Sequence, residues 1–325
     1  MKKIIAFIFL AVMVAGCSGN KQKSPDGMTE QKLEKLETEA EKDYAKSAGT
    51  WIPDTVYADG LKYCYGTVWA GDRLLISNYG GETLDPLGVG GKGYIMQLKD
   101  GVLSEYIPAG GSLNSPKGMA VYGDYLFVAD ISSVLVYNMK NLKAKPQIFP
   151  LPANNVFVSD LAFRNNFLYV TVRDMGSVYM AEIKDPANVM NAEMDLYLST
   201  ISGPNGLAIN KDTMYVVSYP ANDSIGERNG IYMILNLNDV QPMPRKLESL
   251  PGYYCGIQYD PATRMVYYTD DINGQLRSID MNTGDNKLLF PEKIMLAPQM
   301  LTLANGKLYV PDVDGSKLYV FTIKK

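Results

Sequence analysis

The sequence predicts an all-β fold, a six-bladed β-propeller closed by an N-terminal strand, and three observations support this prediction. A unit of roughly 42 to 52 residues occurs six times after residue 63, a period typical of propellers and solenoids. The composition of 23 Tyr, 29 Gly and 18 Pro suits many short strands joined by tight turns. One strand-like segment ahead of the first unit is otherwise without a partner. A closed ring would use that segment, whereas a solenoid would not.

Each unit opens with a small motif and an apolar strand, followed by a tight turn and further strands. The six first strands begin at Tyr65, Lys117, Ser159, Asn205, Cys255 and Gln299. The second strands are equally alike and cover 74–77, 126–129, 168–171, 214–217, 266–269 and 308–311. The dipeptides Asn305-Gly306, Asn273-Gly274 and Asp314-Gly315 predict hairpin turns, in which residues with positive φ are needed.

The two ends of the repeat region predict how the ring closes. The first five units contain a fourth strand, such as 147–150, but the sixth reaches Lys325 after its third strand at 317–321. Residues 54–58 can supply the missing strand, and their pairing with the last unit would protect the sheet edges.

The first 16 residues have the features of a bacterial export signal. Met1–Lys3 is positively charged, and 4–14 is an apolar run of about 11 residues, short of the roughly 20 that span a bilayer. The segment Val14-Ala15-Gly16-Cys17 resembles the bacterial lipobox, in which the chain is cut before the cysteine and the thiol is diacylated, for example with palmitate. This resemblance implies a lipoprotein lipidated at Cys17. An ordinary secretory signal with a chance cysteine is the alternative.

The predicted domains are the signal peptide at 1–16, a lipidated and charged tether at 17–50, and the propeller at 51–325. Two or more acyl chains give stable membrane attachment. Ser18 favours the outer membrane under the enterobacterial sorting rule, with the protein facing the periplasm or the cell surface. The tether has only a thin apolar stripe, which favours a solvated helical spacer over a coiled-coil partner site.

Composition excludes several classes of function. The chain has no histidine, which rules out Ser-His-Asp and Cys-His catalysis and every His-ligated zinc or copper site. The net charge of −4, without a long Lys/Arg run, predicts no nucleic-acid partner. Cys64 and Cys255 start strands on either side of the sixth blade. A disulfide needs Cα atoms within about 7 Å, so this pairing is not favoured, although the sequence leaves it open.

The segment Ser202-Gly203-Pro204-Asn205-Gly206-Leu207-Ala208-Ile209, followed by 214–217, resembles the SMP-30/gluconolactonase/luciferin-regenerating-enzyme-like propellers. That family binds a divalent cation through a Glu, an Asn and an Asp that each precede a glycine, and hydrolyses sugar lactones. The resemblance implies that Asn205 is the Asn ligand and that the cation is Ca²⁺ or Zn²⁺. Tyr65 and Cys255 replace the other two ligands. A hard cation prefers several oxygen ligands, so these replacements leave metal binding and enzymatic activity in question.

The starts of the first strands are expected to ring the mouth of the channel. Tyr65, Lys117, Ser159, Asn205, Cys255 and Gln299 would form this ring, with Asp160 one step deeper. Such a mixed set suits a hydrogen-bonding pocket for a small polar ligand better than a cation cage. Alternatively, Lys117 and Asp160 neutralise one another and water fills the channel.

The ends of the second strands place an acidic rim on the same face. It comprises Asn78, Asp130, Ser218, Asp270, Asp271, Asp312 and Asp314. Asp130, Asp270 and Asp312 could hold a relocated cation, but aspartates that cap turns are the favoured interpretation.

Two long loops, 78–93 and 218–230, belong to opposite blades and face one another across the channel. Long loops on a rigid scaffold commonly bind ligands, and Tyr79, Tyr219 and Arg228 are the expected contacts. Together with the lipid anchor and the lost metal ligands, they favour a binding module for a small polar ligand or a partner protein. A metal-dependent lactonase-like hydrolase and an assembly scaffold stay open.

Overall fold

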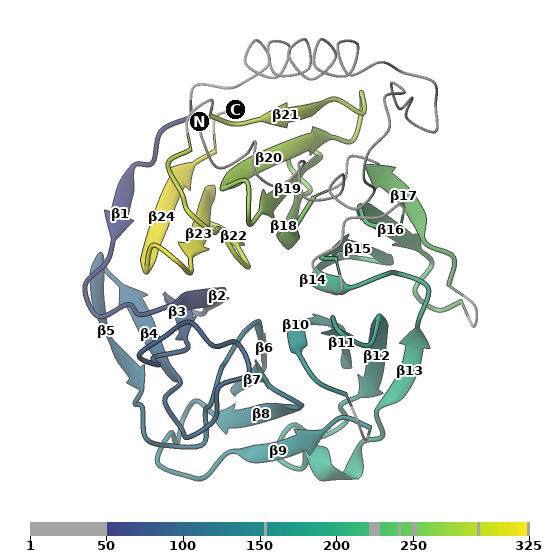
Figure 1. The fold of residues 1–325 in the computed structure, drawn as a ribbon. Helices are drawn as coiled ribbons and strands as arrows, with labels where there is room; N and C mark the ends of the chain where they lie inside the picture. Colours follow the sequence, from purple (N-terminus) through teal and green to yellow (C-terminus); the bar gives the residue numbers. More distant parts are fainter. Residues whose placement is uncertain are drawn as a thin grey trace, which may run out of the picture. The chain divides into compact units, whose positions relative to one another are not determined.

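Six four-stranded antiparallel sheets form the blades of a propeller around a central axis (Figure 1). The computed structural model describes residues 51–152, 155–220, 228–239, 242–248, 252–290 and 293–323. The predicted signal peptide, Cys17 and the tether lie outside these residues. In the part of the chain that is described, no helix is long and apolar enough to cross a membrane.

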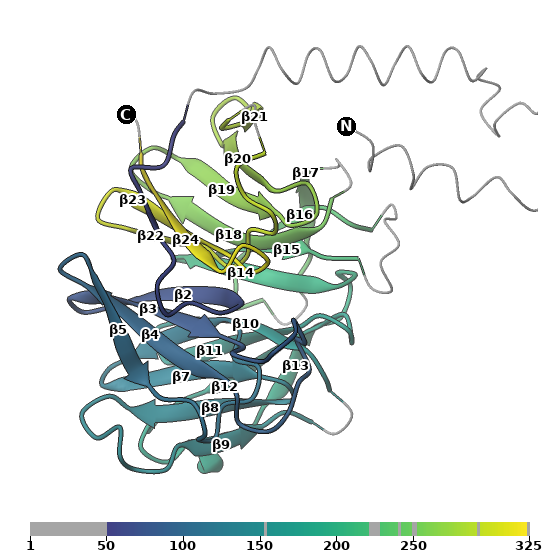
Figure 2. The same cartoon turned by 60° about the vertical axis from the view of Figure 1, so that its left-hand side comes forward.

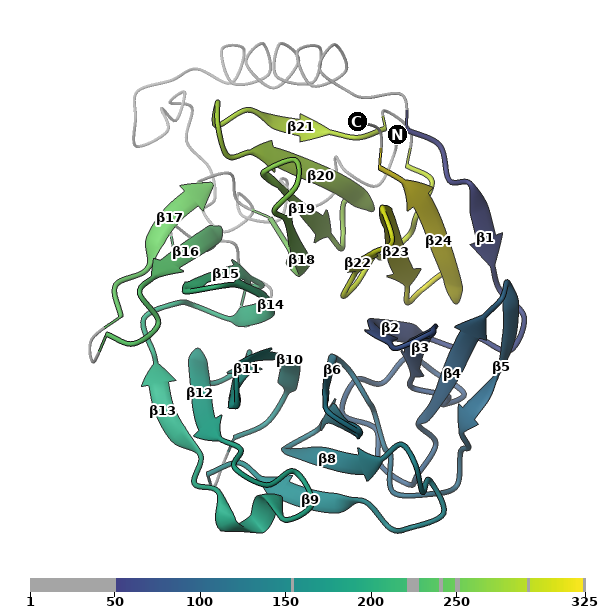
Figure 3. The same ribbon diagram turned by 180° about the vertical axis from the view of Figure 1, so that it is seen from behind.

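The blades follow one another along the chain, as the view from behind also shows (Figure 3). Blade one contains β2 (Cys64–Ala70), β3 (Arg73–Asn78), β4 (Tyr94–Lys99) and β5 (Val102–Ile107). Blade two contains β6 (Met119–Tyr122), β7 (Tyr125–Asp130), β8 (Ser133–Asn138) and β9 (Gln147–Pro150). Blade three contains β10 (Val158–Arg164), β11 (Phe167–Val172), β12 (Ser177–Glu182) and β13 (Asp195–Leu198), with a short 3-10 helix, η2 (Val189–Asn191), before its last strand.

The second half of the ring repeats this order. Blade four contains β14 (Pro204–Asn210), β15 (Thr213–Ser218), β16 (Ile231–Leu235) and β17 (Arg245–Glu248). Blade five contains β18 (Tyr254–Asp260), β19 (Met265–Asp270), β20 (Gln275–Asp280) and β21 (Asn286–Leu288). Blade six contains β22 (Thr302–Ala304), β23 (Lys307–Asp312), β24 (Lys317–Thr322) and, as its outermost strand, β1 (Thr55–Tyr57).

The ring closes through β1, as the unpartnered segment at 54–58 predicts. β1 pairs antiparallel with β24, with Thr55 opposite Val320 and Tyr57 opposite Leu318. At the channel, the Met300 N–H donates to the Tyr65 carbonyl at 3.1 Å and joins blades six and one again. The prediction of six blades and an N-terminal closing strand is therefore confirmed.

The three predicted hairpin dipeptides differ in their backbone geometry. Asn305 and Gly306 have φ of 52° and 70°, the pair of positive values that a type I′ turn requires. In the Asn273-Gly274 dipeptide only Gly274 has a positive φ, of 63°. This glycine ends a four-residue turn that begins at Asp271. At Asp314-Gly315 the predicted hairpin turn is present, between β23 and β24, but the positive φ falls on the following Ser316, at 49°.

Glycines allow the first strands to approach one another around the channel. A Cβ on Gly66 would lie 2.3 Å from the Lys117 carbonyl oxygen, and one on Gly206 would lie 2.2 Å from that of Cys255. No side chain fits such gaps. Hydroxyls on the second strands of blades one, three and five each form a hydrogen bond to the next blade. Ser77, Thr171 and Thr269 donate to the carbonyls of Lys117, Asn205 and Gln299, respectively. These contacts fix the residues that begin the first strands.

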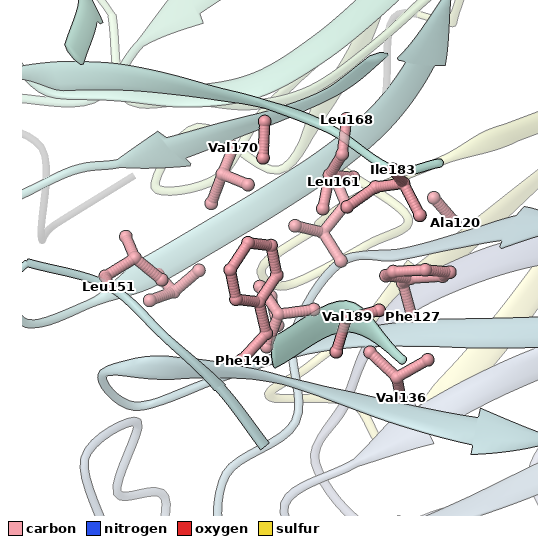
Figure 4. Close-up of a cluster of buried hydrophobic side chains, with 14 of the residues drawn as sticks. Ala120, Phe127, Val136, Phe149, Leu151, Leu161, Leu168, Val170, Ile183 and Val189 are labelled. Atoms are coloured by element: carbon pink, nitrogen blue, oxygen red, sulfur yellow. The ribbon is translucent and has the colours of Figure 1, made fainter. Parts of the chain in front are cut away.

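Apolar side chains fill the space between neighbouring blades, which pack face to face (Figure 2). Between blades two and three, Phe127 and Phe149 meet Leu161, Leu168 and Val170 (Figure 4). Burial of each such side chain stabilises the fold by roughly 1.5–3 kcal/mol. The rigid ring that results presents its channel-facing residues and loops in fixed positions.

Candidate ligand-binding site

A cavity of about 160 Å³ lies at the mouth of the channel. Its walls come from the starts of the first strands and from the loops that follow the second strands. The lining residues are Tyr65, Tyr79, Leu84, Pro86, Phe157, Arg173, Tyr219, Cys255, Asp271, Gln299 and Val313. All blades except blade two contribute directly to this lining.

A larger hollow, of about 270 Å³, lies at the outside of blades two and three, where β9 meets η2. Phe149, Leu151, Met190 and Met194 make it mainly apolar, and Glu193 is its only ionisable lining residue among those described. It lacks the converging polar groups that orient a ligand. The channel cavity is therefore the stronger candidate.

The six ring positions divide into two groups of three neighbouring blades. In blades five, six and one, the open half, Cys255, Gln299 and Tyr65 line the cavity. All six residues are buried, and Gln299 donates to the Ala297 carbonyl at 3.2 Å. In blades two, three and four, the closed half, the residues do not line the cavity, and each donates a hydrogen bond to a backbone carbonyl. These bonds are Lys117 Nζ to Ser115 at 3.0 Å, Ser159 Oγ to Phe157 at 3.4 Å, and Asn205 Nδ2 to Tyr254 at 3.2 Å.

Aromatic rings form much of the cavity wall. Tyr65 and Tyr79 are stacked with their centroids 5.3 Å apart, and Tyr219 meets Tyr253 edge-on at 5.4 Å. The Tyr79 hydroxyl is buried and has no hydrogen-bond partner. Burial also raises the pKa of Tyr79 well above its ordinary value, so this hydroxyl stays protonated and can both donate and accept.

Arg173 supplies the guanidinium of the site. Its Cζ lies 3.4 Å from the centroid of the Phe157 ring and 5.0 Å from that of Tyr219. Its Nε donates to Asp174 Oδ1 at 2.8 Å. Phe157 itself has a φ of 61°, a strained conformation for a bulky residue. The equivalent residues of blades one and four, Tyr63 and Gly203, also have positive φ, of 54° and 58°, so this conformation belongs to the repeated blade backbone.

Asp271 supplies the opposite charge. The Tyr219 hydroxyl donates to Asp271 Oδ2 at 3.2 Å. Burial raises the pKa of Asp271 to about 7; the Tyr219 hydroxyl lowers it, the Asp314 and Asp270 carboxyls raise it, and Gln299 lowers it. No Lys or Arg is among these influences. The carboxyl therefore lines the cavity with hydrogen-bond donors nearby and without a paired cation.

Lys117 and Asp160 do not neutralise one another by direct contact. The Lys117 ammonium lies 4.7 Å from the Phe157 ring centroid and 5.6 Å from that of Tyr79, and burial lowers its pKa to about 7. Asp160 accepts the N–H groups of Leu161 and Leu207, and burial raises its pKa to about 7. Each group thus has its own partners, and Lys117 lies directly behind two rings of the cavity wall.

The rim aspartates mostly serve the backbone. Asp130 accepts the N–H groups of Asn114, Ser115 and Ile131, and Asp312 accepts those of Leu296, Ala297 and Gly315. Asp270 accepts from Asn273 Nδ2, while its Oδ1 is buried without a partner. Turn capping accounts for Asp130 and Asp312. The described residues contain no group of three or more Cys, Asp or Glu side chains that could hold a metal ion.

The positions equivalent to the family's metal ligands do not suit a hard cation. Asn205 Oδ1 is buried and unpartnered, as a ligand atom would be. Burial raises the pKa of both Tyr65 and Cys255 well above their ordinary values, which leaves a neutral phenol and a neutral thiol in place of two carboxylates. Such donors are poor ligands for Ca²⁺. No catalytic step is assigned to a metal here.

Two of the three loop residues that were expected to contact a ligand line the cavity, and the third does not. Tyr79 and Tyr219 line the cavity, but Arg228 is exposed and does not. Arg173, from the loop after β11, is the cationic lining residue, and sequence reasoning missed it because that loop is short. Cys64 and Cys255 are both free and buried, and the Cys64 thiol donates to the Lys317 carbonyl at 3.2 Å.

Comparison with known proteins supports the export signal and the fold. Residues 1–18 match the model described as the prokaryotic membrane lipoprotein lipid attachment site, which confirms the predicted lipoprotein signal. No curated protein matches the chain. Many solved structures do; one, from the crystal structure of a nidogen/laminin complex, has a TM-score of 0.55 and 13% identity over 73% of this chain and 92% of that one. At this identity the likeness shows the fold alone.

These findings define a class of protein. A lipid attachment site of this kind belongs to bacterial proteins that are held at the cell envelope, and the chain is such a lipid-anchored protein with a six-bladed propeller. No comparison adds support for the SMP-30/gluconolactonase resemblance, which stays a prediction.

Proposed function

We propose that this lipoprotein is a binding protein whose open-half cavity holds a small polar ligand. The observation that carries the proposal is the Tyr79 hydroxyl, which is buried in the cavity wall without a hydrogen-bond partner. A buried polar group that lacks a partner costs about 1–3 kcal/mol. Across the same cavity, Asp271 is partly buried and has no paired cation among the described residues. A ligand that hydrogen-bonds both groups would remove these penalties.

The cavity limits the size of that ligand. Pockets for drug-sized molecules enclose about 300–1,000 Å³, and this cavity encloses about 160 Å³. A small metabolite fits such a volume, and so does one side chain of a partner protein. The exposed side chains of Leu84, Leu87 and Val89 on the loop between β3 and β4 favour a protein partner as the second candidate. The outer-membrane location and orientation that Ser18 favours belong to the same proposal.

A thermal-shift screen tests the proposal. Residues 18–325 include every strand of the ring and omit only the signal peptide and Cys17. We expect at least one compound from a panel of amino acids, sugars, sugar acids, lactones and nucleosides to raise the melting temperature. At 100 times its Kd, a ligand stabilises the fold by about 2.7 kcal/mol.

Two matched variants locate the binding site. Tyr79→Phe removes the unpartnered hydroxyl and should weaken the shift. Tyr122→Phe removes the hydroxyl of a tyrosine that stacks on Phe163 and does not line the cavity, and it should leave the shift unchanged. Equal shifts in both variants would place binding elsewhere and contradict the proposal.

The same assay tests the metal-dependent hydrolase. Asn205 Oδ1 is the observation in its favour, because it is a buried oxygen without a partner. EDTA followed by Ca²⁺, Mg²⁺, Mn²⁺ or Zn²⁺ should leave the melting temperature unchanged. A rise with one metal that Asn205→Ala abolishes would instead favour the hydrolase and justify lactone assays.

A further inference from the structure

We propose that the ligand of the open-half cavity is a small zwitterion with an ammonium and a carboxylate on neighbouring atoms, such as a free α-amino acid. This inference rests on the proposed function and specifies its ligand class. The carrying feature is a pair of opposite charges, Arg173 and Asp271, in the wall of one small cavity.

Tyr219 separates the two charges and defines two ends of the cavity. The Arg173 guanidinium lies over its ring, 5.0 Å from the centroid, while its hydroxyl donates to Asp271 at 3.2 Å. Arg173 forms its ion pair with Asp174, so it does not serve as the counter-ion of Asp271. The cavity therefore has a positive end and a negative end, separated by about the length of one phenol side chain.

The positive end suits a carboxylate. A guanidinium has five N–H donors in a planar fork, and the contact with Asp174 uses Nε. Phe157 holds the guanidinium by its ring face, and the Lys117 ammonium, 4.7 Å from the same ring centroid, adds positive potential. A ligand carboxylate at this end would gain charge-assisted hydrogen bonds.

The negative end suits an ammonium. Asp271 is a partly buried carboxyl that has a phenol and an amide as neighbours and, among the described residues, no paired cation. The stacked rings of Tyr65 and Tyr79 stand in the same wall, and ring faces attract cations. The unpartnered Tyr79 hydroxyl can accept one further N–H.

A ligand with a single charge fits this cavity less well. A lone cation would leave Arg173 without a partner inside the cavity and would be repelled by it, and a lone anion would meet Asp271 in the same way. A ligand with both charges satisfies the two ends together. The volume of about 160 Å³ further restricts the choice to small zwitterions.

Calorimetric titration of residues 18–325 with three matched sets of probes tests this inference. Each set contains a zwitterion, the acid that lacks its amine and the amine that lacks its acid. The sets are glycine, acetate and methylamine; L-alanine, propionate and ethylamine; and L-valine, isovalerate and isobutylamine. We expect one zwitterion to bind at least tenfold more tightly than both of its partners.

Two variants should change this preference in opposite directions. Asp271→Asn should weaken binding of the zwitterion and of the amine at least tenfold and retain or strengthen binding of the acid, which Asp271 no longer repels. Arg173→Gln should weaken binding of the zwitterion and of the acid and retain or strengthen binding of the amine. The probe whose binding is retained shows that each variant is folded. Arg173→Lys, which keeps the positive charge, should partly restore the affinity for the zwitterion.

Other outcomes separate this inference from the proposed function. Suppose that no zwitterion binds but a neutral or singly charged compound does, and that Tyr79→Phe weakens its binding. The inferred ligand class is then wrong, while the proposed binding function of the cavity is supported. If neither these probes nor the wider panel bind in a manner sensitive to Tyr79→Phe, both proposals fail.

Discussion

The closed half of the ring, blades two to four, and the open half, blades five, six and one, begin their first strands alike but use the starting side chains differently. In the closed half, Lys117, Ser159 and Asn205 each donate to a backbone carbonyl and none lines the cavity. In the open half, Tyr65, Cys255 and Gln299 line the cavity, although Gln299 also donates to the Ala297 carbonyl. One repeated backbone thus carries both a structural and a ligand-facing set of side chains.

The carboxylates near the ends of the second strands also differ, but within the open half as well as between the halves. Asp130, in the closed half, and Asp312, in the open half, each accept three backbone N–H groups, whereas Asp271 accepts from the Tyr219 phenol and the Gln299 amide and lines the cavity. The backbone needs Asp130 and makes no comparable demand on Asp271. Polar groups that the fold does not use are the ones available to a ligand.

The largest expected effect is the loss of Asp130. Asp130→Ala leaves one buried and two partly buried N–H groups without an acceptor and should lower the free energy of unfolding by about 3–5 kcal/mol. Urea unfolding measures the change. Asp271→Ala should cost less than 1 kcal/mol or stabilise the fold. Equal losses in the two variants would contradict the distinction between a carboxylate that the backbone uses and one that faces the cavity.

Asp271 should also affect the pH dependence of stability. Its pKa is raised to about 7 in the fold, against about 3.9 in an unfolded chain, so the folded state binds the proton more tightly between these values. The free energy of unfolding therefore falls as pH rises from about 4 to about 7. Asp160, whose pKa is also raised to about 7, acts in the same direction.

Asp271→Asn should remove about 2 kcal/mol of that fall, measured by urea unfolding at pH 4.5 and pH 7. Asp174→Asn serves as the control, because Asp174 pairs with Arg173 and does not line the cavity. A pH profile for Asp271→Asn that matches the wild type would show that Asp271 is not held in the buried state described.

Loss of a threonine hydroxyl that links two blades should have a smaller effect on stability, and the effect should be the same in both halves of the ring. Thr171 donates to the Asn205 carbonyl in the closed half, and Thr269 donates to the Gln299 carbonyl in the open half. Thr171→Val and Thr269→Val should each lower the free energy of unfolding by about 1 kcal/mol. Values that differ by more than twofold would show that the backbone frame itself differs between the halves.

The smallest effect on stability is expected for Tyr79→Phe. The hydroxyl that it removes has no partner, so the free energy of unfolding should change by less than about 0.5 kcal/mol. Tyr268→Phe is the matched comparison, because the Tyr268 hydroxyl bonds to Asn286 and Arg277 and its loss should cost about 1–2 kcal/mol. A similar cost at Tyr79 would reveal a protein partner for its hydroxyl.

Much of the fold could be predicted because it depends on short-range patterns. Alternating strands and the unpartnered segment at 54–58 predict six blades and the closure through β1. The positive φ in the sixth-blade turn falls on Ser316 rather than on Gly315, because the Asp312 carboxylate accepts the Gly315 N–H and fixes that turn.

The division of the ring could not be predicted from strand spacing. Spacing places all six ring residues at equivalent points, and only packing decides which are covered. Phe157, Tyr79 and Lys117 come from separate segments, and their contacts seal one side of the channel. Arg173 was missed, and the favoured Arg228 does not line the cavity, for the same reason: loop length does not report which side chain reaches the cavity.

The most direct test of the ligand-binding cavity is a crystal structure of residues 18–325 grown with the compound that raises its melting temperature most. We predict electron density for that compound inside the cavity at the mouth of the channel, within hydrogen-bond distance of the Tyr79 hydroxyl and the Asp271 carboxyl. A compound bound outside this cavity, with the Tyr79 hydroxyl bonded to a protein atom, would contradict the account.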